Sequence, residues 1–292
     1  MRLFTRRGLM KSAGGLLMAG MATGAYGSGI EARAAPRVAR YSIRPGAWPD
    51  GLKLRLVLIA DIHACEPYMP AARIAAICRQ ANALEGDMIL LLGDFISSMG
   101  LSFGPVAPDA WGAALATLAA PLGVHAIMGN HDWFDDPGPL ALENGPTLSH
   151  RALAAIGVPV YDNRVVRLEK DGQPFWLAGL ADQWGPRLGM DDLPGTLAQV
   201  SDTAPVILMA HEPDIFPRVP ERVAVTLSGH THGGQIRLFG YAPIVPSRFG
   251  NRYAYGHIVE EGRHLVVSGG LGTSLLPIRL GSPPELTVVE IG

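Results

Sequence analysis

The sequence predicts an α/β domain with central β-sheets, on three observations. Hydrophobic residues make up 48% of the 292-residue chain, which is enough to bury a large core. Short apolar runs typical of buried strands alternate with longer alanine-rich segments of helical spacing. Polar residues directly follow several of these runs, as expected where strand ends form a binding edge. Because no repeat or low-complexity linker interrupts residues 36–292, we expect one domain there.

Eight apolar runs predict the strands. Each run is short, mostly aliphatic and bounded by polar residues, which is typical of strands buried on both faces. In chain order the runs are 54–60, 88–92, 124–128, 175–180, 206–210, 223–227, 265–267 and 286–291.

Three alanine-rich segments between the runs predict helices, at residues 71–84, 110–119 and 148–156. Two other stretches, 98–108 and 239–255, lack clear periodicity and are rich in glycine, proline and aromatic residues. We expect these two stretches to form ordered loops near the mouth of a site.

The N-terminus predicts a cleavable export signal. Basic residues precede an uncharged run at residues 12–30, which is followed by Glu31 and the small-x-small triplet Ala32-Arg33-Ala34. The pair Arg6-Arg7 resembles a twin-arginine signal, the address of proteins exported in the folded state. The run is weakly hydrophobic for a membrane-spanning helix, although an uncleaved N-terminal anchor is the alternative.

We expect cleavage after Ala34, which divides the chain into a signal at residues 1–34 and a mature domain at residues 35–292. The expected location is the periplasm or the cell envelope, and the expected partner is the twin-arginine export machinery. Residues 1–34 contain five basic residues and one acid, so the chain's net charge of −2 becomes −6 for the remainder. Bulk charge therefore does not favour a nucleic acid as partner.

Cys65 and Cys78 are the only cysteines of the chain. Their number is too small for a disulfide scaffold, and their spacing does not match a CxxC motif. We expect buried thiols, with a single disulfide as the alternative in an oxidising compartment.

Five segments that follow apolar runs carry side chains able to bind metal ions: Asp61-Ile62-His63, Gly93-Asp94, Gly129-Asn130-His131-Asp132, His211 and Gly229-His230-Thr231-His232. Residues two apart in an extended segment point to the same side, so Asp61 and His63 can face one site, and so can His230 and His232. Imidazole and carboxylate ligands without thiolates suit manganese, iron or zinc. Together the segments predict a metal centre where strand ends converge.

These five segments resemble the signature of the calcineurin-like metallophosphoesterases. The segment 268–274, with Pro277-Ile278-Arg279, is similar to the tail of a twin-arginine-exported bacterial phosphodiesterase branch. The resemblance implies a four-layer αββα sandwich, in which two mixed β-sheets are flanked by helices. It also implies two divalent metal ions and hydrolysis of a phosphoester by a hydroxide that bridges them.

The resemblance implies a role for each residue of the site. The seven implied metal ligands are Asp61, His63, Asp94, Asn130, His211, His230 and His232. Asp61, His63 and His232 belong to the first ion, Asn130, His211 and His230 to the second, and Asp94 bridges both.

His131 is the implied catalytic acid, which stays off the metals beside the leaving-group oxygen. Some members of the family carry an acid and an arginine shortly after the Gly-Asp motif, where this chain has Ser97 and Ser98. The partner that orients His131 is therefore open, with Asp132 as a candidate.

The expected substrate is a phosphodiester or pyrophosphate of the envelope or of a lipid. A broad phosphomonoesterase and a non-catalytic metal-binding module are the alternatives. Apolar residues of the two loops predict a rim for acyl chains and peripheral membrane contact; they are Leu101, Phe103, Phe239, Tyr241, Ile244 and Phe249. Four arginines are candidate phosphate contacts, although surface ion pairs are the more frequent role of such residues: Arg237, Arg248, Arg252 and Arg279.

Overall fold

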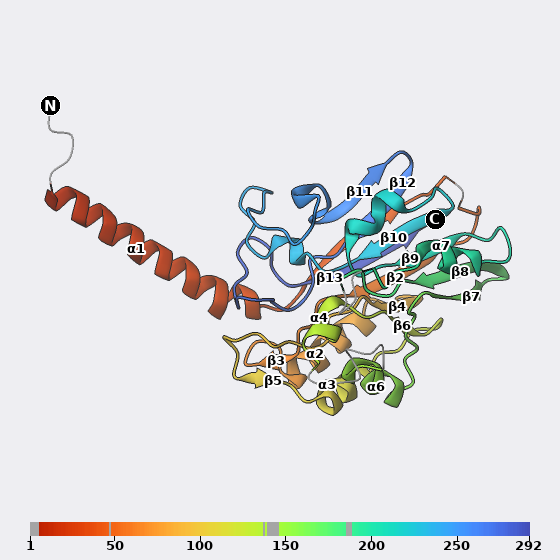
Figure 1. Ribbon diagram of the computed structural model, residues 1–292, viewed down its shortest axis with the longest axis horizontal. Coiled ribbons are helices and arrows are strands. Elements are labelled where there is room, and N and C mark those ends of the chain that lie inside the picture. The colour runs from red at the N-terminus through yellow and green to blue at the C-terminus, as the bar shows by residue number, and fades with distance from the viewer. Residues whose placement is uncertain (1–5, 47, 137, 139–145, 185–188) are drawn as a thin grey trace.

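The computed structural model describes residues 6–46, 48–136, 138, 146–184 and 189–292. Two large β-sheets lie face to face, and helices cover their outer faces (Figure 1). This arrangement confirms the predicted α/β class and the four-layer sandwich. Residues 1–5 of the predicted signal lie outside the described residues.

The first sheet has the strand order β1-β13-β2-β4-β6. Its strands are β1 (Arg37–Ile43), β13 (Glu285–Ile291), β2 (Leu54–Ile59), β4 (Met88–Leu91) and β6 (Val124–Ala126). β2, β4 and β6 run parallel, whereas β13 pairs antiparallel with β2 and parallel with β1. The sheet is therefore mixed, as predicted.

The second sheet has the order β11-β12-β10-β9-β8-β7. Its strands are β11 (Gly256–Glu260), β12 (Arg263–Val267), β10 (Val223–Ser228), β9 (Val206–Met209), β8 (Gln173–Gly179) and β7 (Arg164–Lys170). The four central strands are parallel, and both edge strands are antiparallel to their neighbours. The strands β3 (Cys65–Glu66) and β5 (Gly104–Pro105) form a separate, two-stranded antiparallel sheet.

Helices fill the outer layers. The first sheet is covered by α2 (Ala71–Asn82), α3 (Pro108–Leu115) and α6 (Leu148–Ala155), which correspond to the three predicted helices. The second sheet packs against the 3₁₀ helix η2 (Pro213–Arg218) and α7 (Leu193–Ala198). The short helix α4 (Asn130–Phe134) begins directly after the turn that follows β6.

Strand β2 shows how the layers are held together. Leu56 and Leu58 pack between the two sheets, whereas Val57 and Ile59 pack under the helices. All four side chains are buried, which explains why this strand reads as an unbroken apolar run.

Each of the eight predicted strands is present, but β1, β7, β11 and the two-residue strands β3 and β5 were not predicted. β1, β7 and β11 each lie at the edge of a sheet, and most of their side chains are exposed or half-buried. A search for apolar runs finds strands that are buried on both faces, so it misses edge strands of this kind.

Helix α1 (Arg6–Gly29) projects from the domain (Figure 1). No helix in the described part of the chain is long and apolar enough to cross a membrane. Cys65 and Cys78 are both free and buried, as expected for thiols that serve packing.

We predict that Leu58→Ala lowers the free energy of unfolding by about 2–5 kcal/mol, because it leaves a cavity between the two sheets. Denaturant unfolding of the purified protein measures this loss. Val259→Ala is the matched control, since Val259 lies on edge strand β11 and is 54% exposed. Equal stability of the two variants would contradict the proposed role of the inter-sheet core.

Candidate dimetal centre

The predicted ligand segments meet at the carboxyl ends of strands from both sheets. Asp61 follows β2, Asp94 follows β4, and Asn130 opens α4. From the second sheet, His211 follows β9 and His230 follows β10. The two sheets therefore each contribute one side of the site.

The backbone at these strand ends is unusual. The residues with a positive φ include five of the predicted ligands, and their φ values lie between 48° and 69°: Asp61, His63, Asp94, His230 and His232. A left-handed conformation costs a residue with a side chain about 1–3 kcal/mol, and such residues cluster at functional sites. The strained backbone of these turns directs the five side chains into the site.

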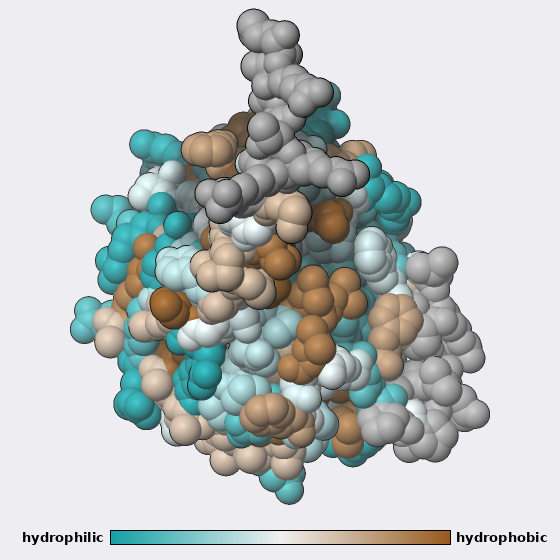
Figure 2. All heavy atoms as spheres, turned by 90° about the vertical axis from the view of Figure 1, so that its left-hand side faces the viewer, coloured by the Kyte–Doolittle hydropathy of each residue, from teal (hydrophilic) through white to brown (hydrophobic). Residues whose placement is uncertain are grey.

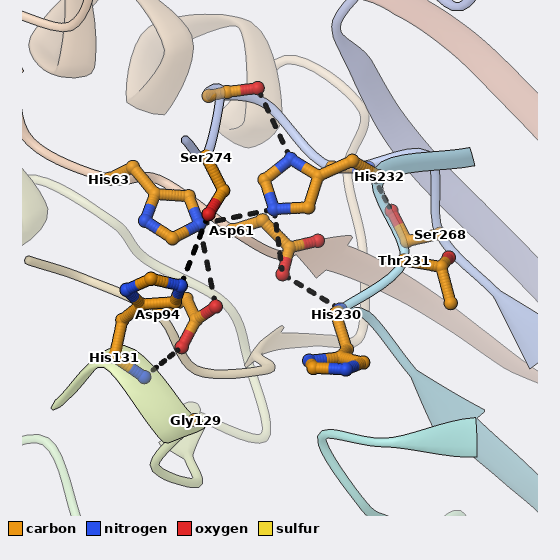
Figure 3. Close-up of polar contacts among 12 residues, drawn as sticks. Asp61, His63, Asp94, Gly129, His131, His230, Thr231, His232, Ser268 and Ser274 are labelled. Carbon is orange, nitrogen blue, oxygen red and sulfur yellow. Dashed lines mark hydrogen bonds and ion pairs between the residues drawn. The ribbon is translucent and has the colours of Figure 1, made fainter. Parts of the chain in front are cut away.

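A first group of four buried side chains gathers around one point (Figure 3). Asp61, His63, Asp94 and His232 each offer one ligand atom, and these atoms all lie within 4.8 Å of one another. The Nε2 atom of His63 lies 3.1 Å from Nε2 of His232 and 3.4 Å from Oδ2 of Asp94.

A second group adjoins the first. Asp94, His211 and His230 also place ligand atoms within 4.8 Å of one another. Nε2 of His211 lies 3.2 Å from the same Oδ2 atom of Asp94, and Oδ1 of Asn130 lies 3.0 Å from Nδ1 of His230. Asp94 therefore belongs to both groups, in the position that a bridging ligand requires.

Backbone carbonyl groups orient two of the imidazoles. Nδ1 of His63 lies 3.2 Å from the carbonyl oxygen of Ile96, and Nδ1 of His211 lies 2.6 Å from that of Leu92. Donation from Nδ1 to these carbonyls leaves the Nε2 lone pairs directed at the centre of the cluster. The tautomer that binds a metal ion is thus set by the strand-end backbone.

The chemistry of the cluster fits two divalent cations. Oδ1 of Asp61 accepts a hydrogen bond from the backbone N–H of His230, but its buried Oδ2 has no hydrogen-bond partner among the described residues. Burial raises the pKa of Asp61 to about 6, because desolvation disfavours its charged form. A cation offsets both penalties, and carboxylate and imidazole ligands suit a transition metal.

Asp132 does not orient His131, so that suggestion from the sequence is wrong. The Asp132 carboxylate is buried and accepts hydrogen bonds from the N–H groups of Asp94, Phe95 and Gly129, at 2.8, 3.0 and 3.0 Å. The hydroxyl of Ser149 donates a further bond at 2.7 Å. Asp132 thus ties the loop after β4 to the loop after β6, which fixes Asp94 relative to Asn130.

The partner of His131 is Asp135, which lies one turn further along the chain and caps the C-terminal end of α4. Nδ1 of His131 lies 2.7 Å from Oδ2 of Asp135. Asp135 is held in turn by the backbone N–H of Ser98 at 2.9 Å and by the Ser98 hydroxyl at 2.5 Å. An i, i+4 pair on a short helix therefore supplies the acid that is missing after the Gly-Asp motif.

The other ring nitrogen of His131 faces the site. Nε2 lies 3.1 Å from the hydroxyl oxygen of Ser274, in the loop that follows β12 (Figure 3). Burial lowers the pKa of His131, but the carboxylates of Asp94 and Asp135 outweigh burial and raise it to about 9. A raised pKa favours the protonated ring, which is the form that a proton donor requires.

The cluster opens into a pocket of about 310 Å³. Its inner wall includes Asp94, Asn130, His131, His230 and His232. Its outer wall is mainly apolar and includes Ile236, Pro243, Ile244, Pro246, Leu275, Leu276 and Ile278. Figure 2 shows hydrophobic residues gathered in patches on the face from which α1 projects.

Of the six residues predicted to form an apolar rim, Ile244 lines this pocket. Phe239 lies on the opposite side of the same loop, in a separate hollow that also contains Arg237 and Tyr255. Leu101, Phe103 and Tyr241 are exposed away from the pocket lining, and Phe249 packs against Tyr253. The structure thus places one of the six predicted rim residues, Ile244, in the pocket lining.

None of the four candidate arginines is among the residues that line the pocket. Arg248 and Arg252 pair with Asp214 and Glu260, and Arg237 lies over the ring of Tyr255. Arg279 is fully buried and donates hydrogen bonds to the carbonyl oxygens of Gly269, Gly272 and Ser282. Its role is to support the loops behind His232.

Sequence reasoning missed Asp135, Ser274 and the apolar residues 275–278. The helical spacing of Asp135 from His131 is a signal that could have found it. Ser274 and its apolar neighbours have no such signal. They lie in the connection between β12 and β13, and only the packing of the two sheets brings this loop to the site.

Comparison with known proteins finds relatives over most of the chain. The chain is 31% identical to the uncharacterized metallophosphoesterase YkuE of Bacillus subtilis, over 100% of this chain and 99% of that protein. It is 28% identical to the phosphodiesterase YaeI of Escherichia coli, over 81% of this chain and 82% of YaeI. The solved Haemophilus influenzae NAD nucleotidase aligns at 15% identity with a TM-score of 0.45, over 75% of this chain and 46% of that one.

The calcineurin-like phosphoesterase family matches residues 54–234, a span that contains every predicted metal ligand. The buried cluster of carboxylates and imidazoles lies within the same span and fits two divalent ions. The chain therefore belongs to the calcineurin-like phosphoesterase family and is a metal-dependent phosphoesterase.

Proposed function

We propose that this protein hydrolyses a phosphodiester or pyrophosphate bond in a lipid-bearing substrate of the cell envelope. The observation that carries the proposal is the pocket itself, whose inner wall is the metal cluster and whose outer wall is apolar. A phosphoryl group can reach the cluster while an attached hydrocarbon chain contacts Ile244, Leu275 and Ile278.

In this proposal the seven predicted ligands would hold the two ions, and Asp94 would contribute to both sites. When bound, such ions lower the pKa of water to near 7 and neutralise charge on a phosphoryl group. The protein's own contribution is to fix the ligands on strained turns and to keep them dry. The Asp132 hydrogen bonds keep the two ligand loops in register.

His131 is the proposed general acid, with its Nε2 atom donating a proton to the leaving-group oxygen. Ser274 marks the place of that oxygen, because its hydroxyl lies 3.1 Å from Nε2 at the pocket wall. Cations held by Asp94 would offset the effect of that carboxylate on His131. Asp135 is then the carboxylate that keeps His131 protonated and correctly oriented.

The charge of the pocket favours a diester over a monoester. No lysine or arginine lines the pocket among the residues that the structure describes. A terminal phosphate carries more negative charge than a diester and is commonly matched by a cationic side chain. The relative YaeI is named as a phosphodiesterase, which supports the same choice for this chain.

We also propose that Arg6 and Arg7 direct twin-arginine export to the periplasm or the envelope. Folding before translocation lets a dimetal enzyme acquire its ions in the cytoplasm, which is a physical reason to use this route. A location at the membrane surface brings the pocket to lipid substrates and makes peripheral membrane contact part of the proposal.

We predict that His131→Ala lowers turnover by about 10²- to 10⁴-fold, because the leaving group loses its proton donor. Asp135→Asn should cost about 10- to 100-fold, since it disturbs only the orientation and charge of His131. Steady-state kinetics measure both losses, and elemental analysis checks that each variant retains two metal ions.

A substrate with a good leaving group, such as a nitrophenyl diester, is the control for these two variants. It needs no proton, so both variants should lose much less activity on it. Full activity of His131→Ala on a diester with an alkyl leaving group would refute the assignment of the general acid.

We predict that the double variant Ile244→Ser/Leu275→Ser loses about tenfold or more activity on micellar phospholipid. A fully buried side chain of this size contributes about 1.5–3 kcal/mol to binding an apolar chain. Activity on the water-soluble head-group diester should not change. Phe103→Ser is the matched control, because Phe103 is 87% exposed but does not line the pocket.

Equal losses on the micellar and soluble substrates would argue against the lipid and leave a phosphoesterase of another substrate class. Loss of both activities together with the metal ions would instead point to a disturbed fold, and elemental analysis separates the two results.

We predict that replacing both Arg6 and Arg7 by lysine leaves folded, metal-loaded protein inside the cell, because the export machinery reads the paired arginines. Fractionation of a producing bacterium measures the distribution. Arg2→Lys is the control, since Arg2 is a lone basic residue of the same region. Undiminished export of the double variant would identify a different route.

A further inference from the structure

Residues 27–34 form part of the folded domain, although the sequence pattern predicts that they are removed with the signal. Most of helix α1 is exposed, but Gly27 near its end and two residues of the short 3₁₀ helix that follows it are buried. Glu31 and Ala32 are only 8% and 2% exposed. A signal that is discarded has no need for buried contacts with the enzyme it leaves.

On one side this segment contacts the loop 278–282. The carbonyl oxygen of Gly27 accepts a hydrogen bond from the N–H of Arg279 at 3.1 Å. A carboxylate oxygen of Glu31 accepts one from the N–H of Ser282 at 3.0 Å. The approach at Gly27 is close, because a Cβ atom there would lie 2.9 Å from both the Arg279 carbonyl oxygen and a methyl carbon of Ile278.

On the other side the segment contacts Arg73 of helix α2. The guanidinium of Arg73 donates hydrogen bonds to the carbonyl oxygens of Ala32 at 3.0 Å and of Ala34 at 2.9 Å. The carbonyl of Ala34 belongs to the peptide bond at the predicted cleavage site. A signal peptidase needs this stretch extended and accessible, whereas here Arg73 holds its carbonyl groups against the domain.

The loop 278–282 leads directly to the metal cluster. The hydroxyl of Ser282 donates a hydrogen bond to the carbonyl oxygen of His232 at 3.0 Å. Arg279 donates to the carbonyl oxygen of Gly272 at 2.8 Å, and its guanidinium lies 3.4 Å from Nδ1 of His232. Residues 27–34 therefore brace the two groups that support His232 from behind.

We propose that residues 27–34 stay in the active enzyme and act as a positioning segment for the metal ligand His232. Helix α1 then remains attached, with its C-terminal end beside Ile278, a residue of the pocket wall. The proposal concerns processing and metal binding, so it does not depend on the substrate.

The first test is the intact mass of the active protein, purified from the envelope of an exporting bacterium that produces the full chain. The expected mature chain begins at or before Gly27. A chain that begins at Ala35 and still holds two metal ions with full activity would overturn the proposal.

The second test uses the full chain with Glu31→Ala, Glu31→Gln and, as control, Arg33→Ala. Glu31→Ala removes the acceptor for the Ser282 N–H and should weaken metal binding by about tenfold, the range for a lost outer-shell partner. Competition with a chelator, followed by elemental analysis, measures metal retention separately from activity. Glu31→Gln keeps an oxygen acceptor and should retain metal like the unaltered chain.

Arg33 lies in the same segment with its side chain exposed, so Arg33→Ala should behave like the unaltered chain. Metal retention by Glu31→Ala equal to that of Arg33→Ala would overturn the positioning role. If Glu31→Ala does not fold, the intact mass still decides whether residues 27–34 stay in the active enzyme.

Discussion

The burial of Asp94 is the constraint on which the rest of the site depends. Its side chain is 1% exposed, and its Oδ2 atom lies within 3.4 Å of imidazoles from both metal groups. Although burial alone would raise the pKa of Asp94, the facing imidazoles of His211 and His131 hold it well below the usual range. A carboxylate kept charged in a dry site needs positive charge around it. Two cations supply that charge, and the strained turns place their ligands on every side.

The same carboxylate links the metal cluster to the proposed acid. Oδ1 of Asp94 accepts a hydrogen bond from the backbone N–H of His131 at 2.9 Å, so helix α4 starts from the bridging ligand. One turn later that helix presents Asp135 to the ring of His131. The position of His131 relative to the metal ligands is therefore set by the local geometry of α4. The loop after β4 adds a hydrogen bond from Ser98 that holds Asp135 in place.

The stretch 274–282 connects three features that are separate in the sequence. Ser274 faces His131, Leu275 and Ile278 line the pocket, and Ser282 supports His232. The N-terminal segment packs against the end of the same stretch. Substrate contact, support of His232 and contact with the N-terminal segment therefore all involve one loop. A change in any one of them would be expected to affect the other two.

The sequence alone determined the strands that are buried on both faces and the ligand types at their ends, because continuous burial and short motifs leave local patterns in the residues. It also determined the family, through motifs that all fall within residues 54–234. Edge strands such as β7 were not predicted, because their half-buried apolar residues are interrupted by exposed charged residues and form no continuous apolar run. Only the tertiary structure decided that Asp135 pairs with His131 and that Asp132 ties two loops, since both acids follow His131 within four residues in the sequence. It alone placed Ser274 and residues 27–34 beside the cluster, because contacts between segments far apart in the chain depend on the packing of both sheets and leave no trace in local spacing.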